Sequence, residues 1–348
     1  MKVSIGTNIK DGPWGGGNLF AINLKNHLHL KGFEVVNNLD DDDIDIILIT
    51  EPRRTSESSA FTHIDVQKYL KFVNSETLVM HRINECDERK NTKYLNKYMI
   101  NANKVADYTV FVSTWLKNLY ENQGISTKNN HVVLAGANKE IFNNKNYVPW
   151  DGSEEMRIVT HHWGANWNKG FDVYTNLDKL ISSKKWQNKI SFTYIGNLPK
   201  NFKFENTKVI KPLSGENLAE TIKKNHIYLT ASINEPSGNH HIEGAQCGLP
   251  LLYIDSGGIP EYCSGFGEIF DKYNFEQKLE KLMHEYLESV ENMKNYPNNS
   301  VIMCNEFENF FIEMIENKEK LLDQRDQNIK IGTLERFLYK LKRRIKII

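Results

Sequence analysis

The chain has 348 residues, and its 44 basic and 44 acidic side chains give a formal net charge of zero. This length favours two domains with sizeable cores, and the balanced charge argues against a nucleic-acid partner. The four cysteines show neither a disulfide framework nor metal-ligand spacing, which indicates a reducing, cytoplasmic environment. The first residues form a strand pattern instead of a signal peptide, and no apolar run approaches the ~20 residues of a membrane span.

The first half of the chain alternates short apolar runs with helical patterns. Strands are predicted at Lys2–Gly6, Phe33–Val36, Asp45–Ile49, Thr77–His81, Thr109–Val112 and Val132–Leu134. Helices are predicted at Asn18–Leu30 and Asn91–Ala106. This alternation predicts a parallel sheet covered on both faces, in a first domain that spans residues 1–145.

A second series of elements follows Asn143–Glu155, a polar stretch that reads as a linker. Strands are predicted at Arg157–Thr160, Ser191–Ile195, Lys208–Ile210, Ile227–Thr230, Leu251–Ile254 and Glu268–Ile269. A helix is predicted at Gly215–Lys224, with Ser214 as its N-cap. The second domain is therefore expected to span residues 152–320. Ligands of such sheets bind beyond the carboxyl ends of the strands, so candidate site residues are sought there.

The most informative run lies between residues 235 and 250. Glu235 and Glu243 are eight positions apart, and a glycine-containing turn lies between them, just after the strand pattern that ends near Ala231. A short helix is expected to begin near Gly238 and to end before Gly248. The free N–H groups and the dipole of a helix start favour an anion such as a diphosphate. Glu243, about one turn further on, would direct its carboxylate at whatever is attached to that anion.

This ordered string, with its continuation Gly244–Pro250 and the loop Asp255–Glu261, resembles the Glu-x7-Glu motif of GT4-type retaining glycosyltransferases. The resemblance implies the GT-B fold, an α/β architecture in which two Rossmann-like domains face a central cleft. It implies a nucleotide-sugar donor, such as a UDP-, GDP- or dTDP-sugar, and neither a cofactor nor a metal. It also implies that Glu243 binds the ribose and Glu235 the donor sugar. The turn, with Gly238, Asn239 and His240, would hold the phosphates.

Lys169 ends a run that is similar to the phosphate-binding segment of the same family. The resemblance makes Lys169 a point charge for the diphosphate. The family's arginine is missing, because Gly164 or Trp163 stands near its place. His161, His162, Asn166 or an arginine from elsewhere in the chain would have to compensate.

The resemblance extends to other positions that follow strands. Gly16 and Gly17 would face the donor phosphates, with a flexible turn as the alternative, and Pro212 and Leu213 would flank the nucleobase. His81 would lie near the donor sugar and join Glu235 and Lys169 as the catalytic set. The expected acceptor-binding residues are Trp14, Arg82, Asp87 and Arg89. For Trp14 the alternative is a cap on the core, and for the three charged residues it is a salt-bridged loop.

Two patterns raise the question of a metal. The acidic run Asp40–Asp45 leads into a strand, which favours an acidic turn over a Mn²⁺ site. The adjacent His161 and His162 have no third ligand at suitable spacing. No metal site is therefore predicted.

The sequence predicts a metal-independent, retaining glycosyltransferase that moves a sugar to a glycan or a lipid-linked acceptor. The resemblance implies front-face attack, in which a donor phosphate oxygen accepts the acceptor's proton. One alternative is a GT-B-fold nucleotide-sugar epimerase or phosphorylase. Another is a non-catalytic, glycosyltransferase-like binding subunit, which the missing arginine would suit.

The last segment, residues 321–348, carries a basic amphipathic pattern. Its apolar positions, at helical spacing, are Leu334, Phe337, Leu338, Leu341, Ile345 and Ile348. Six basic residues surround them, so one expectation is that this helix lies on an anionic membrane surface, which would make the protein peripheral on the inner face of a membrane. The alternative is a helix packed on the protein itself or on a partner.

Overall fold

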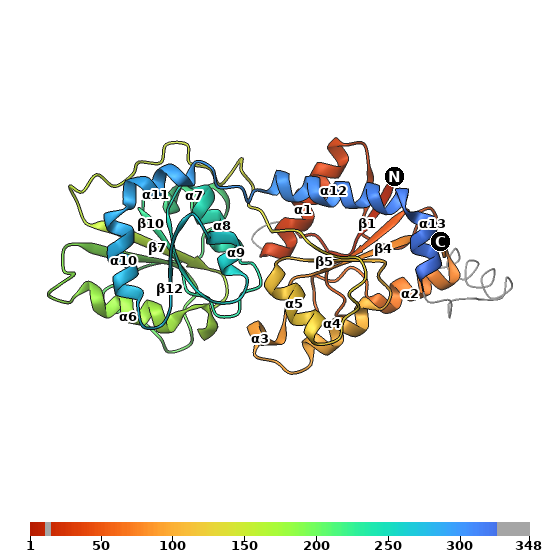
Figure 1. The fold of residues 1–348 in the computed structure, drawn as a ribbon, viewed down its shortest axis with the longest axis horizontal. Helices are drawn as coiled ribbons and strands as arrows, with labels where there is room; N and C mark the ends of the chain where they lie inside the picture. Colours follow the sequence, from red (N-terminus) through yellow and green to blue (C-terminus); the bar gives the residue numbers. More distant parts are fainter. Residues whose placement is uncertain (11–14, 326–348) are drawn as a thin grey trace.

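The computed structural model describes residues 1–10 and 15–325, which form two α/β lobes side by side (Figure 1). Each lobe contains a six-stranded sheet in which all strand pairs are parallel. The strand order is β2-β1-β3-β4-β5-β6 in the first sheet and β12-β11-β10-β7-β8-β9 in the second. Both orders reverse direction within the sheet, as in doubly wound folds.

The first sheet is built from short apolar strands, and β3 and β4 are buried along their whole length because helices cover both faces. Its strands are β1 (Lys2–Ile5), β2 (Glu34–Val36), β3 (Ile46–Ile49), β4 (Leu78–Ile83), β5 (Tyr108–Phe111) and β6 (Asn130–Val132). The helices that connect them are α1 (Gly16–Leu30), α2 (His63–Phe72), α3 (Asp87–Lys90), α4 (Leu95–Asn103) and α5 (Thr114–Asn122).

The second sheet follows the predicted strands closely. Its strands are β7 (Met156–His162), β8 (Ile190–Gly196), β9 (Lys208–Ile210), β10 (Ile227–Thr230), β11 (Leu251–Ile254) and β12 (Gly267–Phe270). Its helical elements are η1 (Trp167–Lys169), α6 (Phe171–Ile181), α7 (Gly215–Ile222), α8 (Asn239–Gln246), α9 (Ile259–Cys263), α10 (Phe275–His284) and α11 (Tyr286–Met293). Ser214 is the N-cap residue of α7, as predicted, but its side chain makes no capping hydrogen bond.

The chain returns to the first lobe after the second sheet is complete. Helices α12 (Ser300–Glu316) and α13 (Lys318–Gln324) lie along the first domain in Figure 1. The ring of Phe307 lies 5.0 Å from that of Phe20 on α1, and Tyr108 on β5 donates a hydrogen bond to Glu313. The predicted boundary at residue 320 therefore differs from the structure, in which residues 300–324 complete the core of the first domain. The apolar face of α12 is buried there.

The predicted linker also differs from the structure. Phe142 is buried in the core of the second lobe, and Tyr147 and Trp150 pack against the same core. The two connections between the lobes run side by side, because Ser300 donates a backbone hydrogen bond to Ala137. The second domain thus begins near residue 135, where Ala135 and Ala137 join its core.

The lobes also meet along a seam formed by α9 and the start of α5. Both carboxylate oxygens of Glu261 accept 2.7 Å hydrogen bonds, from the backbone N–H groups of Thr114 and Trp115. This contact satisfies free N–H groups at the start of a helix of the other domain. Tyr262 donates a hydrogen bond to the backbone oxygen of Val112 and accepts one from the N–H of Ala135. These contacts hold the carboxyl ends of the two sheets toward each other.

Trp14 and the predicted amphipathic stretch Leu334–Ile348 lie outside the described residues. Among residues 1–10 and 15–325, no helix combines the length and the apolar character needed to cross a bilayer.

Candidate functional site

The turn after β10 leads into α8 with the geometry that its sequence predicts. Gly238 is the N-cap residue of α8 and has φ 92°, a value that favours glycine. A Cβ on Gly238 would lie 2.8 Å from a ring atom of His241 and 2.9 Å from one of His240. The turn is therefore closely packed, and α8 begins with backbone N–H groups that have no partner within the helix and no side-chain cap.

A buried ion-pair cluster lies beside this turn and joins the two domains. One carboxylate oxygen of Glu235 lies 2.6 Å from Nζ of Lys169, and the other lies 2.7 Å from Nε of Arg89. Lys169 ends η1 of the second domain, whereas Arg89 belongs to α3 of the first. Arg89 also donates two 2.9 Å hydrogen bonds from Nη1 to the carboxylate of Glu85. Three residues that the sequence singled out, Glu235, Lys169 and Arg89, are thus in direct contact.

The charges of this cluster shift the pKa values of its members. Burial on its own would raise the pKa of Glu235, but Lys169 and Arg89 hold that pKa well below its usual value. At Lys169 burial has the larger effect and lowers the pKa, against the attraction of Glu235. Burial also opposes the charge of Arg89, yet the two carboxylates raise its pKa. Glu235 is therefore a carboxylate at neutral pH, and it is held between two cations.

Glu243 lies within α8 and faces β7. Its Oε2 is 2.8 Å from Nε2 of His161, and Nδ1 of His161 is 2.9 Å from the hydroxyl of Tyr228. These contacts are satisfied when Tyr228 donates to Nδ1 and His161 donates from Nε2 to Glu243. Oε1 of Glu243 makes no hydrogen bond to any residue that the structure describes, so it can accept one from a ligand.

Three further histidines pack beside this pair and stay neutral. Nε2 of His240 lies 2.8 Å from the hydroxyl of Thr230, and its ring is 4.5 Å from that of His162. Burial lowers the pKa of both His162 and His240 well below the usual value, and it lowers the pKa of His241 to about 3. Both ring nitrogens of His241 are buried and lack a hydrogen-bond partner among the described residues.

The glycine pair near the start of α1 faces the turn from the other domain. A Cβ on Gly16 would lie 3.0 Å from the side chain of Asn239, the first residue of α8. The starts of α1 and α8 therefore meet between the lobes, and their dipoles point positive ends into the same space. Among the described residues, no atom lies within 4 Å of the position that a Cβ on Gly17 would take. The absence of side chains here leaves backbone N–H groups open to a ligand.

The structure does not bring His81 or two of the charged residues into this cluster. His81 lies inside β4, fully buried, with Nδ1 2.9 Å from the amide oxygen of Asn103, and burial lowers its pKa to about 4. Arg82 stacks on Phe20 with its guanidinium 4.0 Å from the ring centre, and burial lowers its pKa to about 10. Asp87 accepts hydrogen bonds from the backbone of residues 94–96 and so caps α4.

Other predicted positions of the second domain lie in loops outside its strands and helices. Pro212 and Leu213 are half-buried in the connection between β9 and α7, and neither makes a polar contact with the ion-pair cluster of the described residues. Gly164, which stands where the family's arginine is missing, has open space around it. A Cβ there would meet only Asn166 at 3.5 Å and Lys169 at 3.8 Å. Trp163, its neighbour, is exposed.

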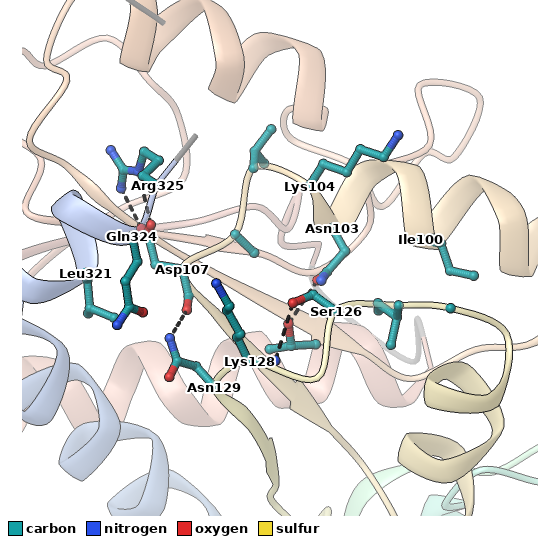
Figure 2. Close-up of a pocket in the computed structure, with 15 residues that line it drawn as sticks. Ile100, Asn103, Lys104, Asp107, Ser126, Lys128, Asn129, Leu321, Gln324 and Arg325 are labelled. Carbon is teal, nitrogen blue, oxygen red and sulfur yellow. Dashed lines mark hydrogen bonds and ion pairs between the residues drawn. The ribbon is translucent and has the colours of Figure 1, made fainter. Parts of the chain in front are cut away.

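A cavity of about 440 Å³ lies in the first domain, beside the amino ends of strands β5 and β6 (Figure 2). Its walls come from the segments that precede β5 and β6 and from the end of α13. Arg325 forms one wall and is held by a buried ion pair with Asp107 at 2.5 Å. Asn103, the partner of His81, also lines this cavity. The cavity lies before strands β5 and β6, whereas Glu235 and Arg89 follow their strands. The cavity is therefore separate from the ion-pair cluster.

Within the described ranges, no group of three or more His, Cys, Asp or Glu side chains is arranged to hold a metal ion. In the acidic run, Nζ of Lys2 lies 3.2 Å from Asp41 and 2.8 Å from Asp43. Asp45 accepts a 2.7 Å hydrogen bond from the backbone N–H of Lys2. The acidic run therefore binds Lys2, the first residue of β1.

Sequence reasoning missed the partners that cross between domains. It placed Arg89 at the acceptor, and it gave no role to Glu85 or to the contact of Glu261 with α5. Arg89 and Glu235 are 146 positions apart, and no spacing rule links residues at such a distance. The available signal was that both follow strands whose carboxyl ends face one cleft.

The comparisons with known proteins agree with this geometry. The Glycosyl transferases group 1 family model matches residues 176–300, a segment that includes Glu235 and Glu243. No curated protein sequence matches the chain.

Solved structures cover most of the chain at low identity. A glycosyltransferase from Rickettsia africae ESF-5 is 15% identical with a TM-score of 0.65, over 91% of this chain and 98% of that one. Anabaena HepE, in complex with UDP and glucose, is 12% identical with a TM-score of 0.65, over 90% and 100%. Sucrose-phosphate synthase from Thermosynechococcus elongatus is 11% identical with a TM-score of 0.60, over 91% and 99%. The predicted GT-B arrangement of two Rossmann-like domains is confirmed, and the second domain carries the match to the Glycosyl transferases group 1 family.

Proposed function

We propose that this protein is a metal-independent, retaining glycosyltransferase that moves a sugar from a nucleotide-activated donor to a glycan or a lipid-linked acceptor. The observation that carries the proposal is the convergence of two cations and two helix starts around one carboxylate between the lobes. Lys169, Arg89 and the starts of α1 and α8 all face the region around Glu235. A nucleoside diphosphate matches this arrangement, because helix starts and cations together bind phosphate oxygens.

The geometry supports a division of roles along the donor. The start of α8 and Lys169 would stabilise the charge that develops on the departing diphosphate. Oε1 of Glu243 would accept a hydrogen bond from a ribose hydroxyl, and Glu235 would orient the sugar. The bond from the anomeric carbon to the phosphate oxygen breaks while the bond to the acceptor oxygen forms on the same face. The acceptor's proton passes to a donor phosphate oxygen, so the mechanism needs no protein nucleophile.

The direct test is a panel of UDP-, GDP- and dTDP-sugars, scored first by thermal shift because a ligand of the native state raises its stability. UDP-glucose is the first probe, since HepE was solved with UDP and glucose. Release of the nucleoside diphosphate that depends on an added acceptor supports transfer. Release without any dependence on an acceptor favours an epimerase or related chemistry, and binding without turnover favours a non-catalytic subunit.

Glu243→Ala is expected to weaken binding of the matching nucleoside diphosphate by about 1.5–3 kcal/mol, because one charge-assisted hydrogen bond to the ribose is lost. Calorimetry with the nucleoside diphosphate and its 2′,3′-dideoxy analogue completes a double-mutant cycle. The variant should not distinguish the two ligands, whereas the wild-type protein should prefer the ribose form. Equal preference in both proteins would remove the ribose role from Glu243.

Transfer is expected to survive a large excess of EDTA. Lys169 and Arg89 supply positive charge at the place where a metal would otherwise neutralise the diphosphate. The measurement is the initial rate of nucleoside diphosphate release before and after chelation. A complete loss of rate that Mn²⁺ restores would contradict the metal-independent mechanism.

A further inference from the structure

Helix α3 of the first domain lies against the second domain through its backbone as well as its side chains. The carbonyl oxygen of Arg89 accepts a 3.5 Å hydrogen bond from the side chain of Asn168, and that of Glu88 accepts a 3.4 Å bond from Asn234. The side chain of Arg89 then reaches Glu235 at 2.7 Å. Figure 1 places α3 at the edge of the first lobe that faces the second. This docking brings the half-buried guanidinium of Arg89 to a carboxylate of the other domain.

The two cations on Glu235 come from different domains and use different oxygens. Lys169 holds Oε2, and Arg89 holds Oε1. Arg89 is itself held in place, because Nη1 makes two 2.9 Å hydrogen bonds to Glu85. Its Nη2 has no hydrogen-bond partner among the described residues. A guanidinium fixed through two of its nitrogens still presents the third as a charged donor.

The second domain leaves space on its own side for one more cation. The Cβ that Gly164 lacks would lie 3.8 Å from Cε of Lys169, and no atom crowds it. Gly164 also lacks the positive φ that would strain a larger residue. A diphosphate brings two negative charges to this place, and from the second domain only Lys169, which is paired with Glu235, contributes a cation to the cluster. Arg89 of the first domain pairs with Glu235 and Glu85 through Nε and Nη1, and its Nη2 has no partner among the described residues, so it is the further cation within reach of a phosphate oxygen.

We propose that Arg89 is a second cation of the leaving-group site, delivered by the first domain when the two lobes close. This inference rests on the proposed function and deepens it. Nη2 of Arg89 donates to an oxygen of the departing diphosphate, while Nε keeps its hydrogen bond to Glu235. The site that stabilises the leaving group is therefore complete only in the closed arrangement. Closure and bond breaking are coupled, which limits hydrolysis of the donor in the open form.

The test compares Arg89→Ala, Arg89→Lys, Gly164→Arg and the double variant Arg89→Ala/Gly164→Arg with the wild-type protein. Arg89→Ala should lower kcat for acceptor-dependent release of UDP from UDP-glucose, or from the best donor of the panel, by about 10²–10³-fold. Its affinity for UDP should fall by less than about tenfold, because the second domain still binds the nucleotide. Arg89→Lys keeps the charge without the forked geometry, so its kcat should lie between those of Arg89→Ala and the wild-type protein.

The double variant separates a chemical role from a merely structural one. Gly164→Arg supplies a guanidinium from the second domain. The kcat of the double variant should therefore be at least about tenfold higher than that of Arg89→Ala. It cannot restore a contact between the lobes. Lys93→Ala, an exposed residue just after α3, is the matched control and should behave as wild type. Thermal melts of every variant confirm that each is folded.

Each outcome decides between the proposals. A slow Arg89→Ala that Gly164→Arg rescues supports the leaving-group role. A kcat for Arg89→Ala within about threefold of wild type overturns this role and leaves the glycosyltransferase proposal intact. A slow Arg89→Ala that neither lysine nor Gly164→Arg improves shows that Arg89 only holds the domains together, which also overturns the role. A wild-type protein that neither binds nor turns over any nucleotide sugar rejects both proposals.

Discussion

Replacing Lys169 with alanine is expected to lower the rate of sugar transfer by about 10²–10³-fold and to weaken nucleoside diphosphate binding as well. Lys169 is buried, and its amino group lies 2.6 Å from Glu235 beside the start of α8. A charge in this position interacts with phosphate in the donor and more strongly in the transition state. Both kcat and the affinity for the diphosphate should therefore fall.

The measurement is kcat for nucleoside diphosphate release, together with calorimetry of the free nucleoside diphosphate. Lys179→Ala removes an exposed lysine from α6 of the same domain and is the matched control. It should leave both quantities unchanged. If Lys169→Ala binds the diphosphate as tightly as the wild-type protein does, Lys169 does not contact the phosphates and its assignment is wrong.

The sequence predicts much of the fold because hydrophobic pattern and strand length are local properties. β9, β10 and β11 match their predicted bounds, and β10 and β11 are short, fully buried runs between polar segments. The predicted helix Asn91–Ala106 is shorter in the structure, where α4 covers Leu95–Asn103 and a separate short helix, α3, ends at Lys90. Asp87 starts α3 and also accepts the backbone N–H groups that begin α4, which separates the two. Such a shared cap depends on the path of the intervening loop, which no periodicity records.

The domain boundaries show where local reasoning ends. α12 carries an apolar face like any surface helix, and the sequence alone does not say which core that face covers. In the structure Phe307 and Phe311 complete the core of the first domain, although they follow the second in the chain. The same limit applies to the linker, where Tyr147 and Trp150 are apolar residues in a polar stretch and pack on the second core.

The candidate site could be predicted where its residues share one turn. The order of Glu235, Gly238 and Glu243 places a carboxylate after β10 and a helix start at residue 239, and both placements are confirmed. The contacts between domains could not be predicted, because they depend on how two sheets face each other. The surroundings of His81 also differ from the expectation. His81 was expected as the last residue of a strand, but β4 continues to Ile83, so its side chain stays inside the first domain.

Glu235→Gln is expected to destabilise the protein and to slow transfer while leaving nucleoside diphosphate binding intact. The glutamine keeps the shape of the side chain but removes the negative charge between Lys169 and Arg89. Removing one partner of a buried ion pair costs about 3–5 kcal/mol, because the remaining charge is left buried and uncompensated. A bound diphosphate brings negative charge back to the two cations. The ligand should therefore raise the melting temperature of the variant at least as much as that of the wild-type protein.

The pH dependence of stability tests the same charge. The pKa of Glu235 is held below its ordinary value of 4.5 in the folded protein, so its carboxylate stabilises the native state fully above that value. This stabilisation is lost as the pH falls and the folded-state carboxyl is protonated. In urea denaturation, the difference in the free energy of unfolding between the wild-type protein and Glu235→Gln should be largest near neutral pH. This difference should become smaller below pH 4.5. Glu276→Gln, which removes an exposed ion pair with Lys185, is the control and should change stability little at any pH. A difference that stays constant from neutral to acidic pH would mean that Glu235 contributes through packing alone, and the case for a charged cluster between the domains would fail.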